Sequence, residues 1–451
     1  MWQNKKRIST LGDEMTWERL YLAGRMVASM DDNTRFAVYK HRLIIKGNLL
    51  VTRQFIVLKH KNGTLQFTDF HRFIKSPVHR VKKYTDDGNS RFYFVVQLLN
   101  YVFFQCGLEK LDDITVEMVA GFLNAYGMCK LPDDHDQTRR SEKTVERCVR
   151  DVMDFLELYI AERKDKCLIK IDDLYKYVNK RDRHGKLITI KVPVFDVHYS
   201  GSMKKIYRDI PNKAFDILFG HIMQNHQEIL GLVLLSAFAG LRPAEACNVR
   251  RPDSPLGPGI LFEIVDGELI KIEIDLQEEL NLRSDLISVG KIKKERKQQV
   301  PDIFLNAFYE AYKVYMKYLE GKKYEEEYGA FTVNKQGRAM TYDSYLKKFQ
   351  DIIQNEIIPR FLNHDDPEIV LYGRILLEHK LSPHVFRHWF TVQLVLSGIN
   401  DPATLMHWRG DLSEKSSLTY LHDKGELQKQ YQKVNNEVHD YLMWAAEKEY
   451  G

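Results

Sequence analysis

The chain has 451 residues, of which 44% are apolar and 29% are charged, a balance typical of a globular protein with two or three domains. Its 67 Lys and Arg residues against 62 Asp and Glu leave a net charge of +5, so net charge alone does not indicate a nucleic-acid-binding protein. Basic residues nevertheless cluster at 59–83 and 291–297, which favours a polyanionic partner over two merely solvated surfaces.

The five cysteines form no Cys-x-x-Cys pair, which argues against a disulfide framework or a cysteine zinc site and favours the cytoplasm. The first ten residues lack the apolar segment of a signal peptide, and no apolar run reaches the about 18 residues that span a bilayer. Neither a phosphate-binding loop nor a dinucleotide motif is present, and the acidic run at 363–366 is typical of a turn. We therefore expect no cofactor, no metal ion and no membrane partner.

The first half of the chain predicts short strands followed by a compact helical block. The strands are expected at 42–50 and 52–70, and the helices at 90–107, 115–127 and 141–163. The last of these helices begins with basic residues that are candidates for DNA contacts: Arg139, Arg140, Lys143, Arg147 and Arg150.

The helical pattern then breaks and later returns. Residues 170–212 are basic and suit an extended linker with one strand at 187–195. Helices are expected at 211–226 and 228–249, and the alternation over 259–303 predicts antiparallel strands. From about residue 304 the chain is mainly helical, so the predicted fold class is mainly α with a small antiparallel β-sheet.

A further helix is expected over 381–398, with Ser382 as its N-cap, Pro383 in its first turn and Gly398 as its stop. Its buried stripe is expected to comprise the apolar residues at helical spacing: Val385, Trp389, Val392 and Leu396. The first turn also carries basic side chains, although a helix dipole disfavours cations at this end: His384, Arg387 and His388. A bound anion such as phosphate would account for them, and the alternative is a solvated turn with a capping histidine.

Four segments, taken in chain order, resemble motifs of the tyrosine recombinases, the phage-integrase family. They are the first-arginine box "AFAGLRPAEACNVRR" (237–251), the lysine hairpin "GKIKKER" (290–296), the His-x-x-Arg-His box "PHVFRHWF" (383–390) and the nucleophile segment "SSLTYLH" (416–422). The match spans roughly 213–425, and residues 88–165 resemble the core-binding domain of this family. The resemblance implies a helical core-binding domain joined to a mixed α/β catalytic domain, which together clamp duplex DNA.

The resemblance also implies how a phosphodiester is held. Arg242 and Arg387 would bind the scissile phosphate, which suits guanidinium groups because they donate two parallel hydrogen bonds and stay charged. His384 would accept the nucleophile's proton or hold a phosphate oxygen. Glu245 is expected to orient Arg242 or His384, and His388 to bond within the helix core.

Tyr420 would be the nucleophile, with Tyr431 as the alternative candidate. Attack on phosphorus gives a 3′-phosphotyrosine bond of similar energy to the broken bond, so rejoining requires no ATP. Lys291 would protonate the leaving 5′ oxygen. Lys293 and Lys294 lie close enough in sequence to take that role or to contact DNA.

One position departs from the family pattern. The family usually has His or Trp after a glycine, about ten residues before the tyrosine, whereas here Asp411 follows Gly410. His407 or Trp408, one turn earlier, could supply the missing donor, although Trp408 is the more typical core residue. A carboxylate beside a scissile phosphate would repel it, so we expect Asp411 to turn away from the phosphate, either to cap the next helix or to pair with an arginine.

The sequence therefore predicts four parts: an N-terminal accessory module (1–65), a core-binding domain (66–169), a basic linker (170–212) and a catalytic domain with a C-terminal helix (213–451). By resemblance the function is site-specific DNA recombination in the integration or excision of a mobile element, with bacterial or phage origin and a nucleoid-associated cytoplasmic location. The partners would be duplex DNA and further copies of the chain, in a tetrameric synapse. The alternatives are a type IB topoisomerase-like enzyme and a catalytically weakened DNA-binding protein. A helix at 426–448 would dock on a neighbouring protomer or on its own domain.

Overall fold

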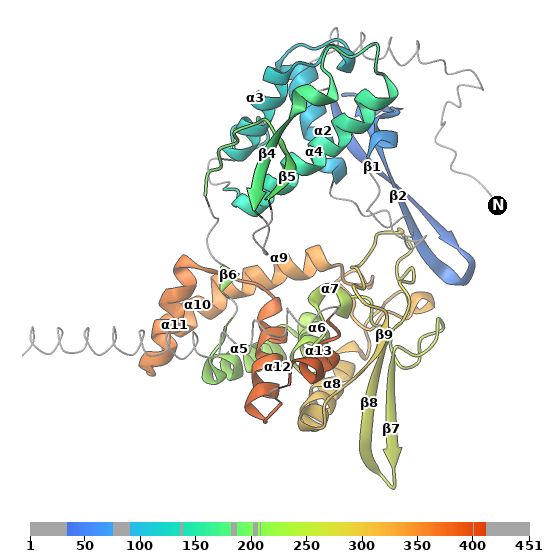
Figure 1. Cartoon of the computed structure of the whole chain (residues 1–451). Helices are drawn as coiled ribbons and strands as arrows, with labels where there is room; N and C mark the ends of the chain where they lie inside the picture. The colour runs from blue at the N-terminus through green and yellow to red at the C-terminus, as the bar shows by residue number, and fades with distance from the viewer. Residues whose placement is uncertain are drawn as a thin grey trace, which may run out of the picture. The chain divides into compact units, whose positions relative to one another are not determined.

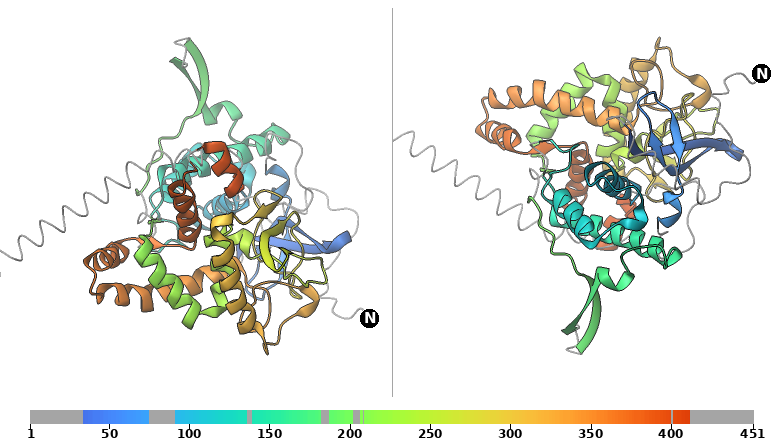
Figure 2. Two further views of the ribbon diagram at one scale, coloured as in Figure 1. Left: turned by 90° about the horizontal axis from the view of Figure 1, so that it is seen from below. Right: turned by 90° about the horizontal axis from the view of Figure 1, so that it is seen from above.

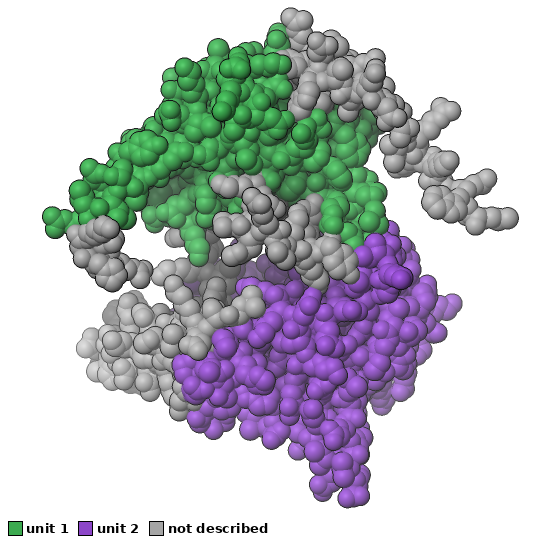
Figure 3. All heavy atoms as spheres, turned by 45° about the vertical axis from the view of Figure 1, so that its right-hand side comes forward, with its two compact units in different colours: residues 1–43, 51–203 green, residues 44–50, 204–451 purple. Residues whose placement is uncertain are grey.

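The computed structural model describes residues 34–74, 91–135, 139–181, 187–201, 206–207, 209–399 and 401–411. The chain divides into two compact units, coloured separately in Figure 3: residues 1–43 with 51–203, and residues 44–50 with 204–451. The boundary near residue 203 falls inside the segment that we expected as a linker. None of the helices in these described ranges is long and apolar enough to cross a membrane.

Unit 1 combines a three-stranded sheet, a helical core and a two-stranded hairpin (Figure 1). Its strands are β1 (Arg35–Ile45), β2 (Leu49–Lys59), β3 (Leu65–Phe67), β4 (Tyr175–Arg181) and β5 (Leu187–Pro193). Its helices are α2 (Arg91–Asn100), continued by the π-turn η3 (Tyr101–Gln105), then α3 (Val116–Gly127) and α4 (Glu142–Glu162), with short 3-10 turns η1 (Lys46–Asn48), η2 (Phe70–Phe73), η4 (Leu111–Asp113) and η5 (Ile171–Leu174). The strands and helices expected in this half of the chain are confirmed.

The early strands of unit 1 lie in the region 1–65, where we expected an accessory module, and they pack against the helical block. Phe36, Ile56 and Leu58 are buried in the same hydrophobic core as Phe92 and Phe155 of the helices. The turn around Asp112 is also fastened to the end of α4, because this buried carboxylate accepts hydrogen bonds from Arg163 Nε at 2.7 Å and from the Tyr159 hydroxyl at 2.7 Å. The strands and the helical block therefore fold as one unit.

The described parts of residues 170–212 form a hairpin, where we expected an extended linker with a single strand. β4 and β5 pair antiparallel from Tyr175↔Pro193 to Arg181↔Leu187. Figure 2 shows this hairpin projecting beyond the helices of its own unit. Leu174, just before β4, is fully buried in the unit 1 core, which anchors the base of the hairpin.

Unit 2 is mainly helical, with one antiparallel sheet and one short parallel pair. Its helices are α5 (Asn212–Asn225), α6 (Gln227–Ala237), α7 (Pro243–Ala246), α8 (Leu305–Leu319), α9 (Tyr342–Ile352), α10 (Ile358–Leu362), α11 (Pro367–Glu378), α12 (His384–Leu396) and α13 (Pro402–Arg409), with the π-turn η8 (Ile353–Ile357) and the 3-10 turns η6 (Asp302–Phe304) and η7 (Glu326–Tyr328). Its strands are β7 (Ile260–Val265), β8 (Glu268–Leu276) and β9 (Arg296–Gln299) in the order β7-β8-β9, and β6 (Ile206–Tyr207) beside β10 (Lys380–Leu381). The predicted fold class, mainly α with small antiparallel sheets, is confirmed.

The core of unit 2 surrounds α6. Residues 229–237 of this helix are all buried, and α12 packs on it (Figure 1). A helix that is apolar on every side must be enclosed by other elements, which is why the first-arginine box, at its C-terminal end, lies deep in the unit. Residues 44–50 also belong to this unit, where the Asn48 side chain donates to the Asn281 carbonyl at 3.0 Å.

The turn after α6 depends on Gly240. This residue has φ +66°, and a Cβ atom here would lie 2.4 to 2.8 Å from ring carbons of Phe390 on α12. We expect Gly240→Ala to lower the free energy of unfolding by about 2–4 kcal/mol, from left-handed backbone strain and overpacking together.

The shift is measured from the denaturant midpoint of the full chain. Gly220→Ala in α5 is the control, since no atom lies within 4 Å of its Cβ position and alanine favours a helix interior. Equal midpoints for the two variants would show that Gly240 does not approach Phe390.

Candidate active site

The site begins at the junction of α6 and α7, where Arg242 is the residue before α7. Its side chain is 15% exposed and donates from Nη1 to Glu245 Oε1 at 2.9 Å and to the Gly410 carbonyl at 3.3 Å. Its Nη2 donates to Oδ1 of Asp411. The guanidinium of Arg242 therefore links the first-arginine box to the segment that follows α13.

Arg387 approaches the same place from the buried side of α12. It is 4% exposed and donates from Nη1 to the carbonyls of Gly240 and, at 2.7 Å, of Arg409. Its Nη2 donates to Asp411 Oδ1 at 2.8 Å. Burial, with Arg409 and Arg242 nearby, lowers the pKa of Arg387 to about 9, against the opposing effect of Asp411. The guanidinium stays charged at neutral pH, and an anionic neighbour offsets the loss of its hydration.

Asp411 is that neighbour, and it lies at the centre of the site. One carboxylate oxygen, Oδ1, accepts from both Arg242 and Arg387, and the other, Oδ2, accepts from Arg409 Nε at 2.8 Å. The carboxylate is buried, so the ion pairs are shielded from water. The expectation that Asp411 pairs with an arginine is confirmed, but the expectation that it turns away from the phosphate position is wrong, because its Oδ1 bonds both arginines that were predicted to hold the phosphate. Two arginines that were predicted to hold a phosphate converge on a single anionic oxygen.

A second carboxylate completes the network. Glu245 is fully buried and bonds Arg242 on one side and Arg296 Nη2 on the other, at 3.0 Å. Burial alone would raise the pKa of Glu245, but Arg296 and Arg242 hold it below its usual value. This geometry supports the predicted positioning role of Glu245.

The named charges of the cluster do not cancel. Four arginines, at 242, 296, 387 and 409, face the carboxylates of Glu245 and Asp411, which leaves an excess of two positive charges. A buried cluster with excess positive charge favours an anion over a cation or a neutral ligand.

The three candidate lysines lie in the loop that joins β8 to β9 rather than on a tight hairpin. The loop is held against α7, because the Lys293 amide donates to Glu245 Oε1 at 3.2 Å and a Cβ on Gly290 would meet the Ala244 carbonyl at 2.1 Å. Lys294 Nζ lies 3.4 Å from the Asp411 carbonyl oxygen, whereas Lys291 is exposed. Lys294 therefore adjoins the arginine cluster directly.

The start of α12 differs from prediction in three details. Pro383 is the residue before the helix, and no side chain caps its first turn. Val385 is buried as expected, but Leu396 is exposed, and burial otherwise follows Phe386, Phe390 and Leu394. The reason is that apolar residues occupy several faces of this helix, so spacing alone did not identify which face packs against α6.

The two histidines in the first turn of α12 differ in their exposure and in their partners. His384 is exposed and lies one turn before Arg387, so it can reach a group bound near the arginines. His388 is buried, and its Nε2 pairs with Asp209 Oδ1, a residue outside the helix. The expectation of a bond within the helix core for His388 is therefore wrong, because the segment before α5 supplies its partner.

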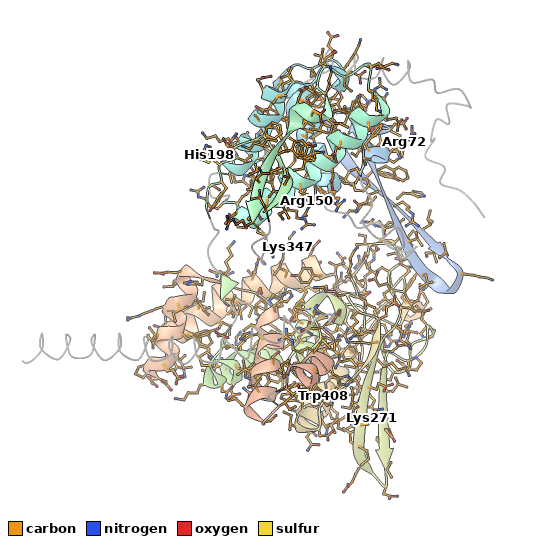
Figure 4. The ribbon with its side chains drawn as sticks, viewed as in Figure 1. Arg72, Arg150, His198, Lys271, Lys347 and Trp408 are labelled. Carbon is orange, nitrogen blue, oxygen red and sulfur yellow. The ribbon has the colours of Figure 1, made fainter. Side chains whose placement is uncertain are left out.

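The two candidate donors on α13 also differ. Trp408, labelled in Figure 4, packs against the unit 2 core, and its carbonyl accepts from Gln298 Nε2 at 2.8 Å, which supports the core role expected for it. His407 is exposed beside it, with ring centroids 5.7 Å apart. Of this pair, His407 is the one whose side chain is accessible to a ligand.

The remaining predicted residues fall into two groups, those outside the described part of the chain and those of unit 1. Tyr420, Tyr431 and the helix expected at 426–448 are outside the described residues. In unit 1, Arg140 is engaged internally rather than presented to DNA: its guanidinium bonds Asp134 Oδ2 at 2.9 Å and lies 3.9 Å from the centre of the Tyr126 ring.

The other basic residues at the start of α4 are exposed: Arg139, Lys143, Arg147 and Arg150. Arg147 and Arg150 also flank the buried carboxylate of Asp151 at 3.8 and 3.5 Å. Both side chains therefore lie on the surface, and each also offsets the negative charge of the buried Asp151 carboxylate.

Two residues of the cluster were missed by sequence reasoning. Arg296 ends the quoted hairpin motif, so the motif itself was the signal for it. Arg409 stands two residues before Asp411 and carried no signal, because only folding brings its guanidinium beside Arg387. Away from this cluster, His221, His226 and Glu356 could hold a metal ion.

Comparison with protein-family models found no match, and neither did comparison with curated proteins. Among solved structures, the chain is similar to the XerH site-specific recombinase bound to difH substrate, with 16% identity and a TM-score of 0.41, covering 75% of this chain and 77% of that one. It is also similar to the XerA recombinase, with 15% identity and a TM-score of 0.31, covering 76% and 89%. A lambda integrase tetramer bound to a Holliday junction shows 13% identity and a TM-score of 0.38, covering 83% and 96%. All three are tyrosine recombinases, and the similarity is one of fold.

Proposed function

We propose that the chain is a DNA strand-exchange enzyme of the tyrosine recombinase type, which cleaves and rejoins duplex DNA through a 3′-phosphotyrosine intermediate. The observation that carries this proposal is the convergence of Arg242 and Arg387 on one buried carboxylate oxygen. Two guanidinium groups that share an anionic oxygen can share a non-bridging phosphate oxygen in the same way. The order of the four motifs along the chain supports the same function.

The proposed chemistry assigns one role to each of the predicted site residues. The Tyr420 oxygen attacks phosphorus, the bond from phosphorus to the 5′ oxygen breaks, and the tyrosine proton passes to His384. Lys294 or Lys291 protonates the leaving 5′ oxygen. Arg242 and Arg387 stabilise the charge that builds on the five-coordinate phosphorus, where the loss of one such donor typically costs about 3 kcal/mol. No ATP is required because the phosphotyrosine bond conserves the energy of the broken bond.

Asp411 must leave the shared position when a phosphate enters it. Two anions at about 4 Å repel by on the order of 4 kcal/mol at an effective dielectric constant of about 20. Arg409 bonds the other carboxylate oxygen, so Asp411 can stay paired with Arg409 while it releases Arg242 and Arg387. In this scheme the Asp411 carboxylate occupies the anion site until DNA binds.

The test uses the full chain and a pool of nicked duplexes with randomised central sequence. The nick lets the short 5′-terminal fragment diffuse away after cleavage, so the covalent intermediate accumulates. We expect protein to stay attached to DNA 3′ ends after denaturation, and sequencing of the attached strands would identify the preferred site. Non-covalent binding without any adduct would reject strand exchange.

Non-covalent binding without an adduct would favour a second candidate function, that of a catalytically weakened DNA-binding protein of the same fold. The specific observation for it is Asp411, because a carboxylate occupies the anion position between the two arginines. A topoisomerase-like enzyme would instead form the adduct and relax supercoiled plasmid without pairing two DNA sites. Assembly with further copies of the chain on DNA is part of the recombinase proposal, and paired-site complexes in gel electrophoresis would test it.

A further inference from the structure

A second group of functional side chains lies in unit 2 and takes no part in the arginine cluster. His221 Nε2 lies 2.8 Å from Glu356 Oε2, and His226 Nε2 lies 2.7 Å from the same oxygen. The two imidazole rings are 5.3 Å apart between centroids. Within the described ranges, these are the His, Cys, Asp and Glu residues whose potential ligand atoms meet closely enough for a metal ion.

Two irregularities in the helices create this arrangement. His226 follows His221 by five positions, so a continuous helix would place their side chains about 140° apart around its axis. Helix α5 instead ends at Asn225, and His226 adopts φ −134° and ψ 48°, which directs its ring towards His221. Glu356 lies in the π-turn η8 that interrupts the run from α9 to α10. Such π-turns occur frequently at functional sites.

The donor set matches that of a zinc-class ion. Two imidazole nitrogens with one carboxylate oxygen form a ligand set known from zinc proteins, with a fourth position open to water. The side chains of His226 and His221 are 10% and 13% exposed, while Glu356 is 35% exposed. The histidines are therefore held in place, while an ion can enter from the carboxylate side.

The outer nitrogens of the two histidines have different partners. Glu228 Oε1 lies 3.6 Å from His226 Nδ1, and Lys348 in turn holds Glu228 at 3.3 Å. An acceptor at this position favours the proton on Nδ1 and leaves Nε2 of His226 free to bind a metal. His221 Nδ1 instead faces two donors, Asn225 Nδ2 at 3.2 Å and Arg360 Nη1 at 3.4 Å, so metal binding through its Nε2 requires both of these side chains to move away from Nδ1.

We propose that His221, His226 and Glu356 bind one divalent ion of the zinc class, which cross-links the junction of α5 and α6 to the π-turn between α9 and α10. The inference is independent of the proposed DNA chemistry, because it rests on other residues. The consequence is structural: an ion that binds the folded state and not the unfolded chain stabilises the fold by mass action.

The experiment titrates chelator-stripped full-length protein with Co²⁺, whose visible absorption reports tetrahedral nitrogen and oxygen ligands, and with Zn²⁺ as a competitor. We expect one equivalent to bind and the unfolding temperature to rise. Glu356→Gln should weaken binding at least tenfold while keeping the fold, because the amide oxygen still accepts from a histidine. His221→Asn is the second variant, so that misfolding of one still leaves a test, and circular dichroism checks both.

His198→Gln is the matched control, an exposed histidine of unit 1 that is labelled in Figure 4. It should bind Co²⁺ as the wild-type chain does. No visible band in the wild type would overturn the proposal, and so would equal affinity in Glu356→Gln and the control. A strong near-ultraviolet thiolate band would assign the ion to cysteines and would overturn it as well.

Discussion

Tyr420→Phe is expected to bind duplex DNA as the wild-type chain does and to form no covalent adduct with it. The phenolic oxygen is the group that would bond to phosphorus, so its removal abolishes the intermediate rather than slowing its formation. Among the described residues, the ion pairs of the arginine cluster are made by other side chains, so phosphate binding should be unchanged. The measurement is the fraction of nicked duplex that stays attached to protein after denaturation, beside a gel-shift titration of the same samples.

Tyr431→Phe is the matched control, since it removes the same hydroxyl from the alternative nucleophile a few residues later. It should form the adduct at the wild-type level. An adduct in Tyr420→Phe together with none in Tyr431→Phe would transfer the nucleophile to Tyr431. Loss of DNA binding in Tyr420→Phe would mean that this residue supports the fold.

Asp411→Asn is expected to lower the free energy of unfolding by about 3–5 kcal/mol, the usual cost of removing one partner of a buried ion pair. The variant leaves Arg387, only 4% exposed, beside Arg242 and Arg409 without the carboxylate that links all three. The neutral amide also no longer competes with an incoming anion. Inorganic phosphate should therefore stabilise the variant more than the wild type. Denaturant midpoints with and without phosphate measure both effects.

Glu310→Gln is the control for this experiment, because Glu310 pairs with Lys313 on the surface, where both side chains are more than half exposed. Exposed pairs of this kind contribute about 0–1 kcal/mol. If Asp411→Asn costs no more than Glu310→Gln, then Asp411 is not the counter-ion of the buried arginines.

Two companion variants then identify the donor near Asp411. His407→Ala should slow cleavage by about one to two orders of magnitude if His407 donates to the phosphate. Should Asp411→His raise the cleavage rate while His407→Ala leaves it unchanged, the site lacks its usual donor, and a weakened or regulated enzyme becomes the better description.

The sequence by itself determined most helices and the identity of the arginine pair. The start of α3 follows from the capping residue Thr115, and the extent of α4 from its apolar stripe, which are local properties. Arg242 and Arg387 were identified because each stands in a motif of several residues with a chemical reason for a guanidinium. Asp411 was expected to pair with an arginine because a carboxylate beside a phosphate is electrostatically unfavourable.

Only the tertiary structure decided which arginines share that carboxylate. Arg409 and Arg387 are 22 residues apart and Arg242 is more distant still, so no local pattern reports that their guanidinium groups converge on Asp411. Burial of α12 against α6 likewise selected the face with Phe386 and Phe390, because a helix that is apolar on several sides has no unique stripe. The His221, His226 and Glu356 group arose from a helix end and a π-turn, two backbone irregularities that regular periodicity does not predict.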